Sequence, residues 1–378
     1  MSVSSSICQE QLRSERLWIH QTIVPDYRLP VFRGLKDRLG DGFKLTCGGQ
    51  WSSGGMNAPV PRDLVPHPLA NRWLLGNRVL WQCGMGRHWR TPGLAIFEFN
   101  LRAPSTWITV RRRAQAGLLT GFWGHTSGRS RTGLAMRVRS WLLDRASCFV
   151  CYTETQASAL RIERPNLSVL VAPNAVMHAR DCWTPQLPVE QVTDVIYVGR
   201  LIREKKPELA IRGFAAAYKS GGLAKTSRLL MVGDGPERAR SEALARELGV
   251  PCAFMGHVSD IDRLREFYAT SLVSLSPGYV GLSATQSLAF GVPILVAKGE
   301  PHSPEIETCV DGETAAFFKQ NSVPALASEL GEIFRRREEW VRRRAPLAKG
   351  TAEKYSYERM INALLDARSR CSAPIKNH

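Results

Sequence analysis

The sequence predicts an α/β protein built from two doubly wound domains. At 378 residues the chain is longer than a single compact core usually accommodates. Short apolar segments alternate with amphipathic helical segments, a pattern typical of parallel strands covered by helices. Glycine follows several of the apolar segments. In an open parallel sheet, ligands bind beyond the carboxyl ends of the strands, so these glycine-containing ends mark the expected site.

The alternation is clearest in the second half of the chain. The expected strands are VIYVGR (195–200), RLLMVGDG (228–235), CAFMGH (252–257), LVSLSP (272–277) and PILVA (293–297). PELAIRGFAAAYK (207–219) and PERARSEALAREL (236–248) are expected helices between them.

The first half shows the same pattern less regularly. The expected strands are WIHQTI (18–23), FKLTCGG (43–49), RVLWQCG (78–84), LLTGFWGH (118–125), CFVCYT (148–153) and SVLVAPN (168–174). PVFRGLKDRLG (30–40) is an expected helix that begins with proline and ends with glycine. Residues 49–78 are interpreted as an irregular loop and 175–193 as a linker, so a first domain over 1–180 precedes a second over 181–350.

The formal net charge of +17 lies mostly in the first domain. Residues 1–180 carry +14 and residues 181–378 carry +3. In the segment 111–146 the side chains of Leu134, Val138, Trp141 and Leu142 fall on one helical stripe, interpreted as core, while Arg137 and Arg139 fall on the solvated side. A basic surface of this kind is suited to nucleic acid, anionic lipid or a phosphorylated substrate.

The sequence favours a cytoplasmic protein. Nine cysteines at uneven spacing favour free thiols over a disulfide framework, and the pair Cys148 and Cys151 is interpreted as two packed thiols. The first residues lack a basic start followed by an apolar segment, and no apolar run is long enough for a membrane span.

The stretch SPGYVGLSATQSLAFGVPILVA (276–297) raises a question about one side chain. Ser283 and Gln286 have the spacing of a capping box at the start of a short helix that ends near Gly291. A helix N-terminus preceded by glycines is suited to phosphate or carboxylate. Gln286 is therefore either a ligand-binding residue or only the cap of the helix.

Five motifs in order resemble a known family. They are VGRLIREKKPELAI, LLMVGDGP, FMGHVSDIDRLREFYATS, SPGYVGLSATQSLAFGVPILVA and HSPEIETCVDGETAAFF, within residues 194–318. Together they resemble the retaining, nucleotide-sugar-dependent glycosyltransferases of family 4, which have the B-type fold of two facing Rossmann-like domains. Elsewhere the likeness is looser, as in FWGHTSGR, and there the chain resembles the members of this family that take part in polysaccharide biosynthesis. The resemblance also implies that KYSYERMINALLDAR, in the segment 351–378, is a C-terminal helix that crosses back to the first domain.

The resemblance implies specific roles for individual residues. Arg200 and Lys205 match the family's diphosphate-binding cations, and fixed cations there would stabilise the departing diphosphate in place of a metal ion. His125 matches a histidine near the donor sugar or the acceptor, although a histidine bonded to a backbone carbonyl is the ordinary alternative. The donor nucleotide is expected against Gly199, Gly281, Leu282, Ser283, Gln286, His257 and Val258.

The sequence departs from the family pattern at two places. Family members carry two glutamates separated by seven residues, where this chain has Gly278 and Gln286. A glutamine still offers an acceptor oxygen for a ribose hydroxyl, whereas glycine offers no side chain. Many relatives carry paired glycines where this chain has Tyr27 and Arg28.

The expected activity is transfer of a hexose or deoxyhexose from a nucleoside-diphosphate sugar to a lipid-linked oligosaccharide, with retention at the anomeric carbon. The reaction is expected to need no metal and to occur at the inner face of the cell membrane, in surface or exported (exopolysaccharide) biosynthesis. An inactive protein that binds a nucleotide sugar or a partner transferase is the first alternative. A nucleic-acid binder is the second, but the sequence lacks a recognisable nucleic-acid module, so no specific nucleic acid is expected.

Overall fold

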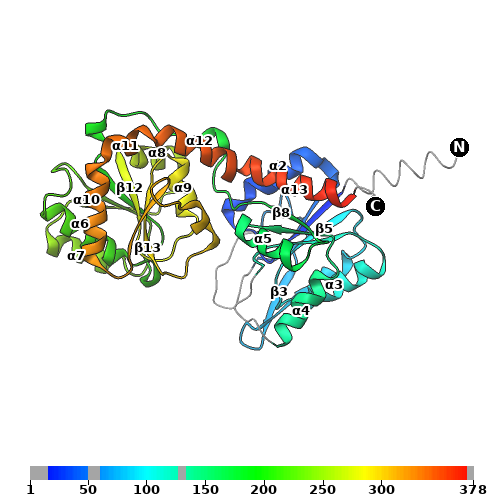
Figure 1. Ribbon diagram of the computed structural model, residues 1–378. Helices are drawn as coiled ribbons and strands as arrows, with labels where there is room; N and C mark the ends of the chain where they lie inside the picture. Colours follow the sequence, from blue (N-terminus) through cyan, green and yellow to red (C-terminus); the bar gives the residue numbers. More distant parts are fainter. Residues whose placement is uncertain (1–15, 50–59, 127–132, 373–378) are drawn as a thin grey trace. The chain divides into compact units, whose positions relative to one another are not determined.

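A computed structural model describes residues 16–49, 60–126 and 133–372 (Figure 1). Contacts divide the chain into two units, Met1–Pro173 with Tyr357–His378, and Asn174–Ser356. The segment interpreted as a linker, 175–193, lies in the second unit and contains two short 3-10 helices, η4 (Ala179–Asp181) and η5 (Val189–Gln191).

The first unit is built on a six-stranded parallel sheet with the strand order β2-β1-β5-β6-β7-β8. Its strands are β1 (Leu17–His20), β2 (Phe43–Thr46), β5 (Leu94–Glu98), β6 (Thr120–Trp123), β7 (Cys148–Cys151) and β8 (Ser168–Val171). β1, β6 and β7 are buried along their whole length, and Cys148 and Cys151 of β7 are free, buried thiols, as predicted. A sheet buried on both faces needs helices on both faces.

The helices of the first unit are α2 (Leu29–Leu39), α3 (Pro104–Gln115), α4 (Leu134–Leu143), α5 (Glu154–Glu163) and α13 (Tyr357–Ser372), with short 3-10 turns η1 (Asp26–Arg28), η2 (Gly40–Gly42) and η3 (Met85–Arg87). The C-terminal helix α13 packs against α2, β7 and β8. The two helices approach closely because α2 has a glycine at the contact. A Cβ atom on Gly34 would lie 2.5 Å from Cδ1 of Ile361.

The structure corrects the first-half predictions in two places. The segment interpreted as a loop contains β3 (Ala70–Leu74), which forms an antiparallel hairpin with β4 (Val79–Cys83) outside the main sheet. RVLWQCG therefore forms a strand, as predicted, but this strand belongs to the hairpin and not to the main sheet. The sheet instead contains β5, which the sequence did not reveal, between β1 and β6.

The predicted core stripe of α4 is also partly wrong. Leu134 is 74% exposed, whereas Arg139, expected in solvent, is buried. The Arg139 guanidinium donates to the carbonyl of Thr126 at 3.0 Å and pairs with Glu163. A charge with several fixed partners tolerates burial, and this explains the reversal.

The second unit is a six-stranded parallel sheet with the order β11-β10-β9-β12-β13-β14. Its strands are β9 (Asp194–Val198), β10 (Leu229–Val232), β11 (Cys252–Gly256), β12 (Ser271–Ser276), β13 (Ile294–Lys298) and β14 (Ala315–Lys319). Its helices are α6 (Pro207–Lys219), α7 (Arg238–Leu248), α8 (Ile261–Thr270), α9 (Ser283–Ala289), α10 (Val323–Arg335), α11 (Arg337–Arg342) and α12 (Arg344–Tyr355), with η6 (Arg203–Lys205) and η7 (Pro304–Thr308). The five predicted strands are present, and α6 has the predicted bounds.

Candidate functional site

The loops after β9 and β10 are packed against each other at the carboxyl edge of the second sheet. Gly233 and Gly235 have φ values of 138° and 156°, and Cβ atoms there would lie 1.9 Å from the carbonyl oxygen of Gly199 and 2.4 Å from that of Leu201. Only glycine fits such close backbone contacts. The packing holds Gly199, a predicted site residue, at the middle of this edge and places Arg200 directly after it.

Lys205 lies in η6, and its side chain reaches the loop that follows β12. Its Nζ donates to the carbonyl of Tyr279 at 2.8 Å and lies 3.6 Å from the centre of the Tyr279 ring. A Cβ on Gly281 would lie 3.6 Å from the same Nζ. The structure therefore brings Lys205 together with Gly281, two residues before α9 begins.

Burial controls the charge of Lys205. The pKa of this ammonium is lowered to about 8, mainly by desolvation and also by the nearby Arg200, while Glu305 acts to raise it. Within the described residues, neither Lys205 nor Arg200 forms an ion pair. A desolvated cation beside a second cation stabilises an anion that arrives between them.

The neighbouring Lys206 has a different role. Its backbone is left-handed, with φ 50°, and its ammonium pairs with Glu300 and donates to Asn321 Oδ1 at 2.6 Å. The Glu300 side chain is only 9% exposed. Lys206 therefore joins η6 to the ends of β13 and β14, while Lys205 remains beside Gly281.

Gly278 is required by the packing of this edge. A Cβ at this position would lie 2.2 Å from the carbonyl oxygen of Glu204 and 2.8 Å from Cα of Lys205. Any side chain at residue 278 would displace η6. The resemblance implies a glutamate at this position, and the backbone contact leaves no space for one.

The capping box predicted for α9 is absent. The helix has Leu282 at its N-cap with no side-chain capping bond, so Ser283 is already the first helical residue. The interpretation of Gln286 as a cap is therefore wrong. Ser283 and Gln286 lie three residues apart and are half-buried, whereas the residues between and after them are buried: Ala284, Thr285, Ser287 and Leu288. The two side chains share the open face of the helix.

His257 and Val258 follow β11, on the other side of β10. His257 is exposed and Val258 is half-buried. The loops after β10 and β11 are joined by a bond of 2.8 Å from the Gly233 N–H to the Gly256 carbonyl. The predicted base-binding residues therefore belong to the same sheet edge as Gly199, two strands away along the order β11-β10-β9.

Glu305 is a residue of this edge that the sequence reasoning missed. It is buried in η7, accepts a bond of 2.9 Å from Asn174 Nδ2 and interacts electrostatically with Lys205. The adjacent loop is fixed by His302, which accepts from the Val280 N–H at 2.9 Å and donates from Nε2 to the Ala297 carbonyl at 3.0 Å. Glu305 lies in the motif HSPEIE, and its carboxylate was the sequence feature that could have identified it as a site residue.

The carboxyl edge of the first sheet contains an extensively bonded arginine. The Arg28 guanidinium donates to Gln21 Oε1 at 2.7 Å and to the Tyr152 hydroxyl at 2.6 Å, and lies 4.9 Å from the Trp123 ring centre. It is buried, and its bonds join η1 to the residues that follow β1 and β7. His125 follows β6, is exposed, and lies with its ring centre 4.9 Å from that of Tyr152. The role of His125 near the donor sugar or the acceptor stays a prediction.

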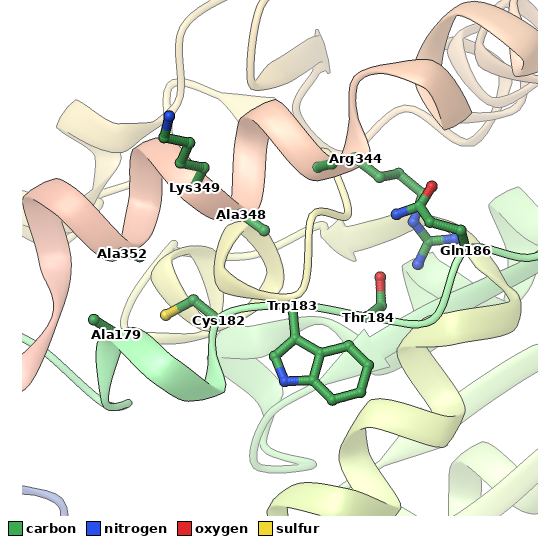
Figure 2. Close-up of a pocket in the computed structure, with 10 residues that line it drawn as sticks. Ala179, Cys182, Trp183, Thr184, Gln186, Arg344, Ala348, Lys349 and Ala352 are labelled. Atoms are coloured by element: carbon green, nitrogen blue, oxygen red, sulfur yellow. The ribbon is translucent and has the colours of Figure 1, made fainter.

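Two further features bear on the chemistry of the described residues. Within them, no three His, Cys, Asp or Glu side chains converge as metal ligands, and no helix is both long and apolar enough to cross a bilayer. A pocket of about 280 Å³ lies between α12 and the segment that contains η4, and Figure 2 shows the residues that line it. Its Arg344 donates to the carbonyls of Tyr268 and Ala269 at the end of α8, before β12 begins. This pocket therefore lies away from the carboxyl edge that holds Lys205.

The match to a known protein family lies within the second unit. Residues 184–346 match the family described as glycosyl transferases group 1. The GDP-mannose-dependent alpha-(1-6)-phosphatidylinositol dimannoside mannosyltransferase of Mycobacterium tuberculosis is 33% identical over 174 residues, covering 45% of this chain and 42% of that protein. The D-inositol 3-phosphate glycosyltransferase of Acidothermus cellulolyticus is 37% identical over 158 residues, covering 39% of this chain and 34% of that protein. The chain thus spans less than half the length of these relatives.

Solved structures show the fold of almost the whole chain. Anabaena Alr3699/HepE in complex with UDP has a TM-score of 0.68 at 14% identity, covering 93% of this chain and 99% of that one. A glycosyltransferase from Rickettsia africae ESF-5 has a TM-score of 0.68 at 13% identity, covering 96% and 99%. The predicted fold class, two Rossmann-like α/β domains as in B-type glycosyltransferases, is confirmed.

Proposed function

We propose that this chain is a glycosyltransferase that moves a hexose or deoxyhexose from a nucleoside-diphosphate sugar to a lipid-linked oligosaccharide, with retention, in surface or exported polysaccharide biosynthesis. The observation that carries the proposal is the Lys205 ammonium, half-buried without an ion pair among the described residues, beside Arg200 and Gly281. The match of residues 184–346 supports it. A curated relative acts on a phosphatidylinositol dimannoside by its name, which supports a lipid-linked acceptor.

In the proposed reaction, Arg200 and Lys205 bind the diphosphate of the donor. The bond between the anomeric carbon and the diphosphate oxygen breaks, and its electron pair goes to that oxygen. The acceptor hydroxyl oxygen forms the new bond on the same face, and its proton goes to the departing diphosphate. The two cations stabilise the charge that develops on this leaving group. No metal ion is required for this step, so we expect activity in the presence of a chelator.

The remaining site residues would bind the nucleotide. We propose that the backbone N–H groups of Gly281, Leu282 and Ser283 face the phosphates, and that Gln286 binds the ribose from the open face of α9. The His257–Val258 loop would contact the base. His125 would contact the donor sugar or the acceptor, and the protein would act at the inner face of the cell membrane.

The clash at Gly278 favours a second candidate, an inactive protein that binds nucleotide sugars. This edge has no space for the side chain with which the family contacts the donor sugar. The test is a thermal-shift screen of UDP, GDP, ADP and dTDP, followed by transfer from the corresponding sugars to a lipid-linked acceptor. A ligand that binds only the folded state raises the melting temperature. Binding with turnover supports the transferase, binding without turnover supports the second candidate, and no binding of any nucleotide overturns both.

A further inference from the structure

The segment from residue 64 to residue 143 has an unusual composition. It contains twelve arginines, no lysine and one carboxylate, Glu98, together with six of the ten tryptophans of the chain. Glu98 Oε2 accepts the Thr22 N–H at 2.6 Å, so this carboxylate is engaged at the sheet edge. The described surface of β3, β4, α3 and α4 therefore carries arginines with no carboxylate among them.

The hairpin of β3 and β4 exposes apolar side chains at its tip. Leu74 is 50% exposed and Leu75 is 76% exposed, and Trp81 of β4 is 41% exposed opposite Arg72 of β3. Leu75 also has φ 51°, a conformation that favours glycine or asparagine. A leucine there contributes neither to packing nor to the turn, which indicates a role for its exposed side chain.

A groove of about 360 Å³ lies between α3 and α4. It is lined by Trp107, Ile108, Val138 and Trp141, with an exposed arginine from each helix at its sides, Arg111 and Arg137. Ile108 is 43% exposed. Apolar side chains beside arginines are the arrangement of proteins that bind at the interface of a bilayer.

The hairpin and the groove are continuous through α3. The Leu80 N–H donates to the Arg102 carbonyl at 2.7 Å, and the Gln82 N–H donates to Ser105 Oγ at 3.2 Å, so β4 lies along the start of α3 (Figure 1). We call this region the hairpin–groove surface. It consists of Leu74, Leu75, Trp81, Trp107, Ile108, Val138 and Trp141 with Arg72, Arg78, Arg111 and Arg137.

We propose that the hairpin–groove surface docks on a bilayer that contains anionic phospholipids. The arginines would bind lipid phosphates, since a guanidinium matches phosphate geometry, and the hairpin tip would enter the boundary between headgroups and acyl chains. Exposed leucines have no use against a nucleic-acid backbone, so the apolar tip favours lipid over nucleic acid. The inference takes from the proposed function only the lipid-linked acceptor, and it does not depend on turnover.

The test is flotation of the purified full chain with vesicles of phosphatidylcholine alone or with about 30% phosphatidylglycerol. The expected result is recovery with the anionic vesicles and little with the neutral ones. The double variants Leu74→Ser/Leu75→Ser and Arg111→Gln/Arg137→Gln should each lower the partition coefficient roughly tenfold. Salt should weaken the binding of the leucine variant more than that of the arginine variant, because only the leucine variant still binds through the charges of Arg111 and Arg137.

Matched controls keep the test specific. Ile162→Ser/Val310→Ser removes two exposed apolar side chains elsewhere, and Arg212→Gln/Arg246→Gln removes two exposed arginines from α6 and α7. Both controls should bind as the unmodified chain does. Equal recovery with neutral and anionic vesicles, or hairpin–groove variants that bind as well as the controls, would overturn the proposal. A folded protein that binds DNA but no vesicle would assign the surface to nucleic acid instead. Nucleotide binding in the thermal-shift screen tests the proposed function separately.

Discussion

Arg28 in the first unit and Lys205 in the second both lie near the carboxyl edge of a parallel sheet. Arg28 is buried and Lys205 is half-buried, and their partners differ. Arg28 donates to Gln21 and Tyr152 and lies over an aromatic ring. Lys205 has one carbonyl acceptor and one ring among the described residues, and burial lowers its pKa to about 8.

This difference distinguishes a structural cation from a binding cation. A buried charge whose donors are bonded to the protein stabilises the packing around it. A buried charge with few partners destabilises the fold and favours an arriving anion. We therefore expect substitutions at Lys205 to affect binding and turnover more than folding, and the following predictions test that separation.

The largest effect is expected on turnover. Arg200→Ala and Lys205→Ala should each lower the transfer rate by roughly a hundredfold or more, the scale seen when one charge-stabilising group is removed. Lys219→Ala, at the exposed end of α6, is the matched control and should retain full activity. Steady-state assay of the three folded variants is the measurement. Unchanged rates in both site variants would remove these residues from the diphosphate site.

Gly278 should be more sensitive than Gly281 to the addition of one methyl group. A Cβ on Gly278 meets the Glu204 carbonyl at 2.2 Å, whereas a Cβ on Gly281 makes an ordinary contact of 3.6 Å with Lys205 Nζ. We expect Gly278→Ala to lower the free energy of unfolding by about 2–4 kcal/mol and Gly281→Ala by less than about 1 kcal/mol. Urea denaturation measures both. Equal losses would show that η6 moves easily and that residue 278 has space for a side chain.

The affinity for the donor nucleotide should depend on pH through Lys205. Because the pKa of this ammonium is lowered to about 8, it loses its proton as the pH rises above that value. Affinity should then fall by up to about tenfold per pH unit. The free energy of unfolding should change in the opposite direction. It should rise between about pH 8 and the pKa of Lys205 in the unfolded chain, since the unfolded chain binds more protons than the folded one in that range. Nucleotide titrations of Lys205→Met between pH 7 and pH 9.5 should show no such change in affinity. If the change persists in this variant, another group is responsible for it.

The smallest effect is expected at Gln286. Since α9 has no side-chain capping bond, Gln286→Ala should change the free energy of unfolding by less than about 0.5 kcal/mol. If Gln286 binds the ribose, donor affinity should fall roughly fivefold to tenfold, and Gln286→Glu should retain it because a carboxylate also accepts from a hydroxyl. Calorimetric titration of the nucleotide separates these outcomes. Wild-type affinity in Gln286→Ala would exclude the ribose contact.

Much of the second unit could be predicted from its sequence because its local signals agree with its structure. Pro207 begins α6 and an amphipathic pattern continues to Lys219, so the predicted helix has the observed bounds. The capping box failed because the chain enters α9 one residue earlier than expected, at Leu282. The bond between Glu305 and Asn174 joins residues 131 positions apart, and no local pattern reports such a contact.

The first unit was less predictable for identifiable reasons. β5 is a short strand whose first four residues are all apolar, and periodicity does not distinguish such a run from a buried helical segment. The hairpin was missed although Gly76 and Asn77 follow Leu75 in its turn, because no residue of β3 is fully buried and its sequence shows no clear apolar strand pattern. Arg139 was assigned to solvent from its place in the pattern, but its bonds to Thr126 and Glu163 depend on the tertiary structure.

Lys205 as a binding cation and Lys206 as a structural one are distinguished by a comparison of Lys205→Met with Lys206→Met. Each variant is titrated calorimetrically with the nucleoside diphosphate that stabilises the unmodified chain most, and its melting temperature is recorded. Lys205→Met should lose at least about tenfold in affinity with an equal or higher melting temperature, because a desolvated charge is removed. Lys206→Met should keep its affinity within about threefold but melt at a lower temperature, because Glu300 loses its partner. Wild-type affinity in Lys205→Met would contradict the account.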